Sequence, residues 1–351
     1  VRRALQGIDS EIIVVDNHSR DGSVEYLSRL EGVRLIESGH NLGFSKANNI
    51  AIRQSEAEYV LLLNPDTIVA EDSVKKMLYF ADTHPKAGGI GVRMYNDWGT
   101  KARESRRGLP SPMTSFYKMV GLCRRMPLHP RYGKYYMGWL PWDAASRIEV
   151  VSGACFLIRR KALDEVGVLD EDYFMYGEDI DLSYRLLKGG WENWFVPADI
   201  IHYKGESTHK TSFEYVHVFY NAMLIFMRKH YSHLSRLVIW PLQVAVYFIA
   251  MLTLVSAMWS MMKKSLGFAR RYDKEFPMLI LEGSDKMRKG LNLIDDIRQA
   301  GQQVVIRVFD PSETPYADII SMMQQTANER VRLGLYHSDS DIIITQMEIY
   351  E

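Results

Sequence analysis

The first half of the chain alternates short apolar runs with segments in which apolar side chains recur at helical spacing. The runs at residues 12–15, 33–36, 59–63 and 89–95 have the length and composition of buried strands. Between them, apolar residues return every three or four positions, as they do along one face of an α-helix. Strands joined by helices in this way lie parallel in one sheet. We therefore predict an α/β domain with a mostly parallel sheet flanked by helices.

Residues 96–147 interrupt this alternation with five prolines, many aromatic residues and a large excess of bases over acids. A long irregular segment inside a compact domain is usually functional or disordered. Regular structure resumes with predicted strands at residues 149–158 and 191–196, and an aromatic-rich helix at residues 213–230 follows. We expect the α/β domain to extend to the end of that helix.

Residues 237–262 contain no charged residue and carry Trp240 and Trp259 near their ends. The segment is long enough to span a bilayer, and tryptophans suit the two membrane interfaces. A helix lying in the membrane surface and a buried core helix are the alternatives, because Pro241 interrupts the run and basic residues flank both ends. We predict a membrane-associated helix over residues 233–268.

The tail over residues 269–351 has the pattern of a small α/β domain, with strand-like runs at 278–281, 304–306 and 341–344. Its strand-to-helix turn at 282–285 lacks the full Gly-x-Gly-x-x-Gly pattern, so support for nucleotide binding there is weak. The chain begins without methionine and ends directly after a strand-like run, which we take to favour a truncated product.

The overall composition argues against two classes of protein. Lys and Arg together number 43, as do Asp and Glu, so no net charge points to nucleic acid as a partner. The two cysteines, Cys123 and Cys155, are too few for a secreted disulfide scaffold and fit a reducing compartment.

Acidic and amide side chains follow two of the predicted strands. Asp16 and Asn17 come after the first strand, and Asn64 and Asp66 come after the third. In open parallel sheets the ligand crevice lies beyond the carboxyl ends of the strands, so both turns would line one site. The alternative is ordinary turn chemistry, in which Asp and Asn are also favoured.

Residues 175–182 hold three carboxylates within four positions, those of Glu178, Asp179 and Asp181. Acids this concentrated are costly to bury, so they either face water or hold a cation, a proton or a substrate hydroxyl. We interpret the stretch as the catalytic corner of an enzyme. Acidic capping of the helix that follows is the alternative, with Asp181 favoured as the cap.

Five ordered motifs in the chain resemble those of family 2 glycosyltransferases, most of all bacterial rhamnosyltransferase-like enzymes that build surface polysaccharides. The resemblance implies a Rossmann-like GT-A fold for a domain over residues 1–232. The motifs lie at residues 14–23, 41–49, 64–67, 152–156 and 177–182.

The family's nucleotide site begins with a strand upstream of Ala4, which this sequence lacks, so we expect the first strand of the domain to be missing. A second hypothesis is therefore a catalytically inactive sugar-nucleotide-binding or scaffold protein derived from this fold. A third is a membrane-attached regulatory protein whose transferase part serves docking.

The resemblance also implies roles for single residues. Asp16 matches the carboxylate that hydrogen-bonds the nucleotide base. Asp66 ends a relaxed Asp-x-Asp motif and would ligate a divalent cation, Mn²⁺ or Mg²⁺, with His202 as a second ligand. The full set implied for the nucleotide sugar is Asp16, Asn17, Asn41, Lys46, Asn48, Asn64, Asp66 and Gly153.

The resemblance assigns catalysis to Asp179, as the general base that takes the proton of the acceptor hydroxyl, with Glu178 beside it on the acceptor side. The basic segment after Tyr95 would face an acceptor on a lipid diphosphate, or else form a solvated loop. The implied activity is inverting, metal-dependent transfer of a hexose from a nucleotide-diphosphate sugar to a glycan or lipid-linked acceptor in surface polysaccharide synthesis. The implied location is the cytoplasmic face of the bacterial inner membrane.

Overall fold

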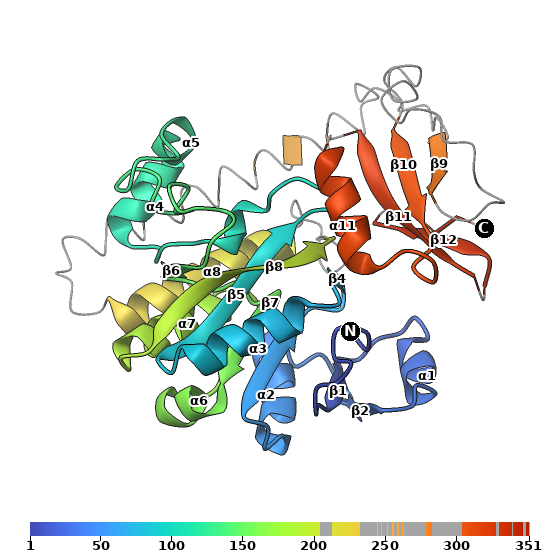
Figure 1. The fold of residues 1–351 in the computed structure, drawn as a ribbon. Helices are drawn as coiled ribbons and strands as arrows, with labels where there is room; N and C mark the ends of the chain where they lie inside the picture. Colours follow the sequence, from blue (N-terminus) through green and yellow to red (C-terminus); the bar gives the residue numbers. More distant parts are fainter. Residues whose placement is uncertain are drawn as a thin grey trace.

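The computed structural model describes most of the first 231 residues and parts of the tail. It forms three sheets with covering helices, and the tail sheet lies at one end of the central body (Figure 1). The predicted membrane-associated helix at 233–268 lies outside the described residues, apart from single helical positions. The described residues are 1–203, 213–231, 278–282, 304–327, 330–338, 340–346 and 349–350, with positions 244, 247, 251, 255, 258, 259 and 262.

The largest sheet has six strands in the order β3-β7-β5-β8-β4, with β6 paired to β8. Strands β5 and β8 run parallel, whereas β3/β7, β5/β7, β4/β8 and β6/β8 are antiparallel pairs. The prediction of a mostly parallel sheet is therefore wrong for this sheet, which is mixed. The strands are β3 Tyr59–Leu63, β4 Thr67–Val69, β5 Ala87–Tyr95, β6 Ser146–Ile148, β7 Cys155–Arg159 and β8 Glu192–His202.

The mixed direction follows from the path of the chain. Strand β7 comes after the long irregular segment rather than after a crossover helix, so it can enter antiparallel between β3 and β5. Strand β4 follows β3 after a turn at residues 64–66 and pairs with the end of β8, Thr67 opposite His202. This pairing brings the turn after β3 next to the last residues of β8.

The first two strands form a separate sheet. Strands β1 (Ile12–Asp16) and β2 (Val33–Glu37) are joined through α1 (Ser23–Ser28) and run parallel, as predicted. Helix α2 (Phe44–Gln54) follows and leads to β3. In the part of the chain that is described, β1 and β2 pair only with each other. Their position against the rest of the domain therefore depends on loop and helix contacts.

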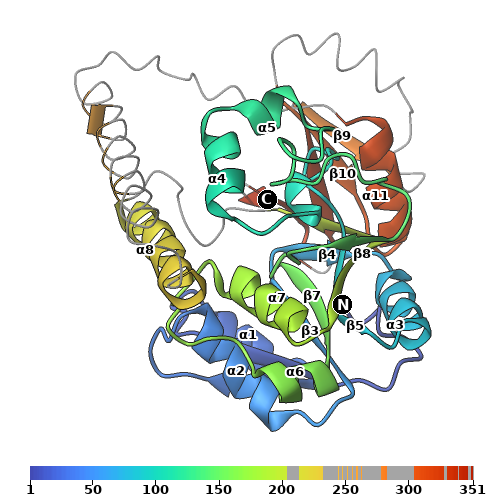
Figure 2. The same ribbon diagram turned by 90° about the vertical axis from the view of Figure 1, so that its left-hand side faces the viewer.

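Helices cover both faces of the six-stranded sheet (Figure 2). Side chains alternate between the two faces along β7, so Phe156 packs with Leu182 of α7 while Leu157 packs with Met77 of α3. Each face thus has its own apolar core. The helices are α3 Ser73–Thr83, α4 Pro112–Met119, α5 Leu122–Arg125, α6 Arg160–Val166, α7 Glu178–Lys188 and α8 Phe213–His230, with a 3₁₀ turn at Arg103–Ser105.

The tail forms a five-stranded sheet in the order β13-β12-β11-β10-β9, with α11 packed on it. Strands β9, β10 and β11 are parallel, and β12 and β13 continue the sheet antiparallel. The strands predicted at 278–281, 304–306 and 341–344 are confirmed as β9, β10 and β12. The bounds are β9 Met278–Glu282, β10 Val305–Phe309, α11 Tyr316–Gln325, β11 Val331–His337, β12 Ile342–Thr345 and β13 Ile349–Tyr350.

Polar contacts dock the tail sheet on the larger domain. The Glu71 carboxylate accepts hydrogen bonds from the backbone N–H groups of Tyr316 (2.8 Å) and Ala317 (3.0 Å), at the start of α11. A carboxylate there satisfies helix amides that lack partners within the helix. The buried Asp97 binds Arg332 of β11 at 2.6 Å. The tail sheet and the larger domain also share one apolar core.

No described helix is long and apolar enough to cross a bilayer.

Replacing Glu71 with alanine removes the acceptor for the first amides of α11. We expect the free energy of unfolding, measured by urea denaturation, to fall by about 1 kcal/mol. The exposed Glu56, changed to alanine, serves as the matched control and should cost less than about 0.5 kcal/mol. Equal losses in the two variants would contradict the capping role of Glu71.

Candidate active site

The turn after β1 and the turn before α2 form one polar corner. The buried Asp16 accepts hydrogen bonds through Oδ2 from the N–H groups of His18 and Ser19, both at 3.1 Å. The Asn17 Oδ1 accepts from Leu42 N–H at 2.7 Å, and its Nδ2 donates to Asn41 Oδ1 at 2.9 Å. Three residues predicted for the nucleotide sugar are thus brought together. Turn chemistry, the alternative interpretation, accounts for the contacts that these side chains make with one another.

The other residues predicted on α2 differ in environment. Lys46 is exposed, and Asn48 donates from Nδ2 to Phe44 O of the preceding turn at 2.9 Å. Asn49, which the sequence did not single out, is fully buried. Its Nδ2 donates to Leu169 O at 2.8 Å, and its Oδ1 accepts from Leu169 N–H at 3.1 Å. Asn49 therefore fixes α2 to the segment that precedes the acidic stretch.

A second contact joins the same two segments at Gly43. Its φ of 81° lies in the left-handed region, and a Cβ there would lie 2.4 Å from the carbonyl oxygen of Phe174. The next residue, Phe44, donates its N–H to that oxygen at 2.7 Å. Only glycine fits this close approach. The polar corner is thereby held against the acidic stretch.

The two predicted metal ligands are neighbours. Asp66 Oδ1 lies 3.1 Å from His202 Nε2, and the two side chains are 14% and 12% exposed. Two ligands at adjacent corners of an octahedron, each about 2.1 Å from a cation, lie about 3 Å apart. His202 Nδ1 is buried and has no hydrogen-bond partner among the described residues. The separation of the pair fits two ligands of one divalent cation. The described residues contain no cluster of three or more metal-binding side chains.

The turn between Asp66 and β3 lies beside the predicted Gly153. Asn64 donates its backbone N–H to Ala154 O at 3.0 Å, and its own carbonyl accepts from Thr67 Oγ1 at 2.7 Å. Gly153 in turn donates its N–H to Asp179 Oδ2 at 3.2 Å. Backbone hydrogen bonds therefore connect the predicted metal-binding turn to the predicted base.

The three neighbouring carboxylates of α7 have three different surroundings. Asp179 bonds Gly153 and forms an ion pair with Arg107. Asp181 is buried and binds Arg185 Nε at 2.7 Å and His230 Nε2 of α8 at 2.6 Å. The prediction that Asp181 caps the helix is wrong. The cap position falls on Gly177, four residues earlier, and no side chain bonds there.

Glu178 is the carboxylate with the most perturbed ionisation. Burial, followed by the negative charge of Asp179, raises the pKa of Glu178 from 4.5 to about 8. Its Oε2 is buried, and no described residue forms a hydrogen bond with it. Glu178 is therefore neutral at pH 7, and its carboxyl proton can be donated to a ligand or water.

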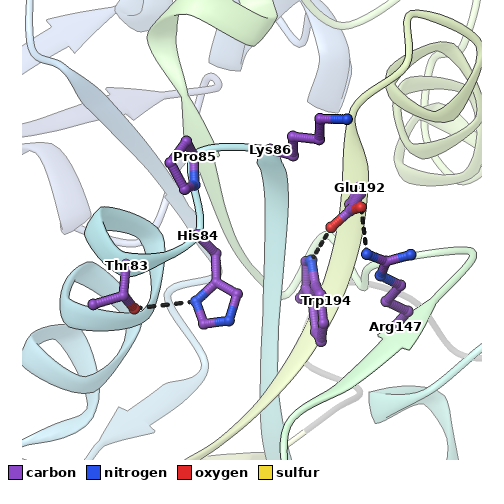
Figure 3. Close-up of a pocket in the computed structure, with 7 residues that line it drawn as sticks. All are labelled: Thr83, His84, Pro85, Lys86, Arg147, Glu192 and Trp194. Atoms are coloured by element: carbon purple, nitrogen blue, oxygen red, sulfur yellow. Dashed lines mark hydrogen bonds and ion pairs between the residues drawn. The ribbon is translucent and has the colours of Figure 1, made fainter.

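A depression elsewhere on the domain has no part in this arrangement. It has a volume of about 410 Å³ and is lined by residues around Arg147, Glu192 and Trp194 (Figure 3). Glu192 accepts from Trp194 Nε1 at 3.0 Å and binds Arg147 at 2.6 Å. This depression lies at the start of β8, whereas His202 is the last residue of that strand. The site is therefore defined by the side chains above rather than by this depression.

Glu178→Gln should change how stability depends on pH. Between pH 4.5 and 8 the folded parent keeps the Glu178 proton while the unfolded chain releases it, so the parent loses stability as pH rises. The variant lacks this loss, so its melting temperature should gain on the parent by about 4 °C or more between pH 5 and pH 8. The exposed Glu56→Gln is the control. A difference that stays constant with pH would rule out the raised pKa.

Comparison with known proteins agrees with the resemblance. The model of glycosyl transferase family 2 matches residues 2–167. The rhamnosyltransferase WbbL of Escherichia coli is 27% identical over 221 residues, which cover 58% of this chain and 78% of WbbL. A solved structure of the mannosyltransferase PcManGT from Pyrobaculum calidifontis, with GDP-Man and Mn²⁺, is 14% identical and superposes with a TM-score of 0.40. The match covers 90% of this chain and 76% of the PcManGT chain. So distant a structural likeness says nothing about the ligands of this chain.

The family is established by a nearer relative. The N-acetylglucosaminyl-diphospho-decaprenol L-rhamnosyltransferase of Mycobacterium tuberculosis is 31% identical over 245 residues, covering 63% of this chain and 75% of the relative. The chain therefore belongs to glycosyltransferase family 2, as a glycosyltransferase similar to rhamnosyltransferases.

Proposed function

We propose that the protein transfers a hexose, of the rhamnosyl type, from a nucleotide-diphosphate sugar to a hydroxyl group of a lipid-linked glycan, with inversion. The observation that carries this proposal is that hydrogen bonds hold the polar corner at Asp16 close to the stretch that contains Asp179. These bonds join α2 to the segment before α7. The named acceptor of the mycobacterial relative, an N-acetylglucosaminyl-diphospho-decaprenol, supports a lipid-diphosphate acceptor.

Asp179 is the general base of the proposed reaction. It takes the proton of the acceptor hydroxyl while the hydroxyl oxygen attacks the anomeric carbon of the donor. The bond from that carbon to the diphosphate breaks, and its electron pair leaves with the diphosphate. A single displacement of this kind inverts the anomeric configuration. The hydrogen bond from Gly153 N–H to Asp179 Oδ2 orients the base.

Asp66 and His202 would hold the divalent cation, and Asp16 would bind the nucleotide base. A bound cation would offset charge that builds up on the leaving diphosphate. One imidazole with one carboxylate favours Mn²⁺ somewhat over Mg²⁺. The geometry in support is the 3.1 Å separation of Asp66 Oδ1 and His202 Nε2.

We also assign the protein to the cytoplasmic face of the bacterial inner membrane, where a lipid-linked acceptor would be presented. On α4 and just beyond it, Met113, Phe116 and Val120 are exposed at one-face helical spacing. Residues 105–142 contain seven Lys or Arg and no Asp or Glu. Exposed apolar groups beside unopposed bases suit an anionic lipid surface. The described helical positions between 244 and 262 are exposed and apolar as well.

Asp179→Asn tests the transfer mechanism. Because an amide cannot take the acceptor proton, kcat should fall by about 10²-fold or more while affinity for the donor is retained. Nucleotide release and calorimetric donor binding measure the two quantities. The exposed Asp164→Asn is the control and should match the parent. Full activity in Asp179→Asn would exclude this base, and donor binding without release by the parent would favour an inactive sugar-nucleotide-binding protein.

Membrane contact is tested by co-sedimentation with vesicles of phosphatidylcholine containing about one third phosphatidylglycerol. Phe116→Ser with Val120→Ser, and separately Arg124→Gln with Arg125→Gln, should each weaken binding about tenfold or more. Tyr79→Ser removes a still more exposed aromatic side chain from α3 and should leave binding unchanged. Unaltered binding in both double variants, or none by the parent, would contradict the assignment.

A further inference from the structure

Arg107 belongs to the long basic segment, yet its backbone is fixed beside the predicted base. Its carbonyl accepts hydrogen bonds from the N–H groups of Glu149 (3.1 Å) and Val150 (2.9 Å). Its Nη2 donates to Val151 O at 3.2 Å and to Asp179 Oδ2. The backbone of the extended residues that lead to Gly153 therefore fixes both the main chain and the guanidinium of Arg107.

The ion pair between Arg107 and Asp179 is shielded from water. The two side chains are 15% and 14% exposed. Shielding charges costs free energy that a structural ion pair offsets only when its remaining donors and acceptors are satisfied. Within the described part of the chain, Arg107 Nε is buried without a hydrogen-bond partner, so this pair is only partly satisfied. The Nε of neighbouring Arg106 is buried in the same way, but its guanidinium donates to Leu140 O and lies over the Trp142 ring.

The contacts that Asp179 makes with the described residues leave one side of its carboxylate for a ligand. A carboxylate offers about four lone-pair positions. Those of Oδ2 receive Arg107 Nη2 and Gly153 N–H, and Oδ1 receives Ile180 N–H at 2.8 Å. The remaining lone pair of Oδ1 is the one that can accept an acceptor proton. Arg107 thus selects which oxygen acts.

The charges around Asp179 come from two elements. On its own helix lie Glu178, which is neutral at pH 7, and Asp181, which is paired elsewhere. On the basic segment lie Arg107 and Tyr135. Burial by itself lowers the pKa of Arg107, but the charges of Asp179 and Tyr135 outweigh it and raise that pKa. Arg107 is therefore the cation that faces the base.

We propose that Arg107 is a positioning residue for the transfer, which holds the Asp179 carboxylate through Oδ2 and leaves Oδ1 to receive the acceptor proton. The inference rests on the proposed function, because it takes Asp179 to be the base. It adds a residue whose role lies in the variable basic segment rather than in any of the five motifs.

Carboxyl NMR of protein labelled with ¹³C-Asp tests the contact without requiring turnover, with Asp179→Asn assigning the signal. At neutral pH, Arg107→Met should move the Asp179 signal, because the carboxylate loses the hydrogen bond from Nη2 to Oδ2. Arg107→Lys, which keeps a charged donor, should leave the signal close to that of the parent. Arg103→Met, an exposed change in the same segment, is the control.

Steady-state kinetics of single and double variants test the role in transfer. Arg107→Met should lower kcat by about tenfold or more with the KM for the donor unchanged, while Arg107→Lys and Arg103→Met stay near the parent. In the Asp179→Asn background Arg107→Met should have little further effect, because Arg107 acts through that carboxylate. Equal losses of kcat in the two backgrounds would overturn the proposal, as would an unmoved NMR signal. If Arg107→Met does not fold, an Arg107→Lys variant with the kcat loss expected for methionine would overturn it too. A parent without turnover would refute the proposed function, while the NMR signal would still decide whether Arg107 holds the Asp179 carboxylate.

Discussion

The hydrogen bonds between α2 and the segment before α7 hold the two halves of the site together. Strands β1 and β2 form a sheet of their own, so within the described residues they share no ladder with the main sheet. Asn49 binds Leu169 in both directions, and Phe44 binds Phe174 O beside Gly43. Together with the ion pair between Arg53 of α2 and Glu171, these bonds fix the polar corner at Asp16 relative to the acidic stretch. The spatial relation between donor and base is thus set by one buried amide, one glycine turn and one ion pair.

The three acids of the acidic stretch can lie close together because each carboxyl group has a different environment. Glu178 is buried and keeps its proton at neutral pH. Asp179 faces Arg107, and Asp181 lies between Arg185 and His230. One neutral carboxyl and two compensated carboxylates avoid the repulsion that three adjacent anions would cause. The same division gives each acid a separate task, since the Asp181 contacts tie α8 to α7 while Asp179 keeps one lone pair open.

Sequence periodicity predicted the strands, which depend on residues close together in the chain. It did not predict features that depend on how distant segments fold back against one another. The strands at 12–15 and 59–63 follow from periodicity, whereas the pairing of Asp66 with His202 was implied only by the family resemblance. The antiparallel entry of β7 follows from neither, because strand direction is decided by how a long irregular segment folds back. Arg107 was one base among many in that segment. Its contact with Asp179, 72 positions further along the chain, marks it as part of the site.

The central claim is that the polar corner and the α7 carboxylate form one inverting transferase site. Its most direct test is the anomeric configuration of the product, measured by NMR, when the protein is given nucleotide-diphosphate sugars, Mn²⁺ and an N-acetylglucosaminyl-diphospholipid. The account predicts nucleotide release that requires the acceptor, and a product whose configuration is opposite to that of the donor. Retention of configuration, or no acceptor-dependent release from any donor, would contradict it.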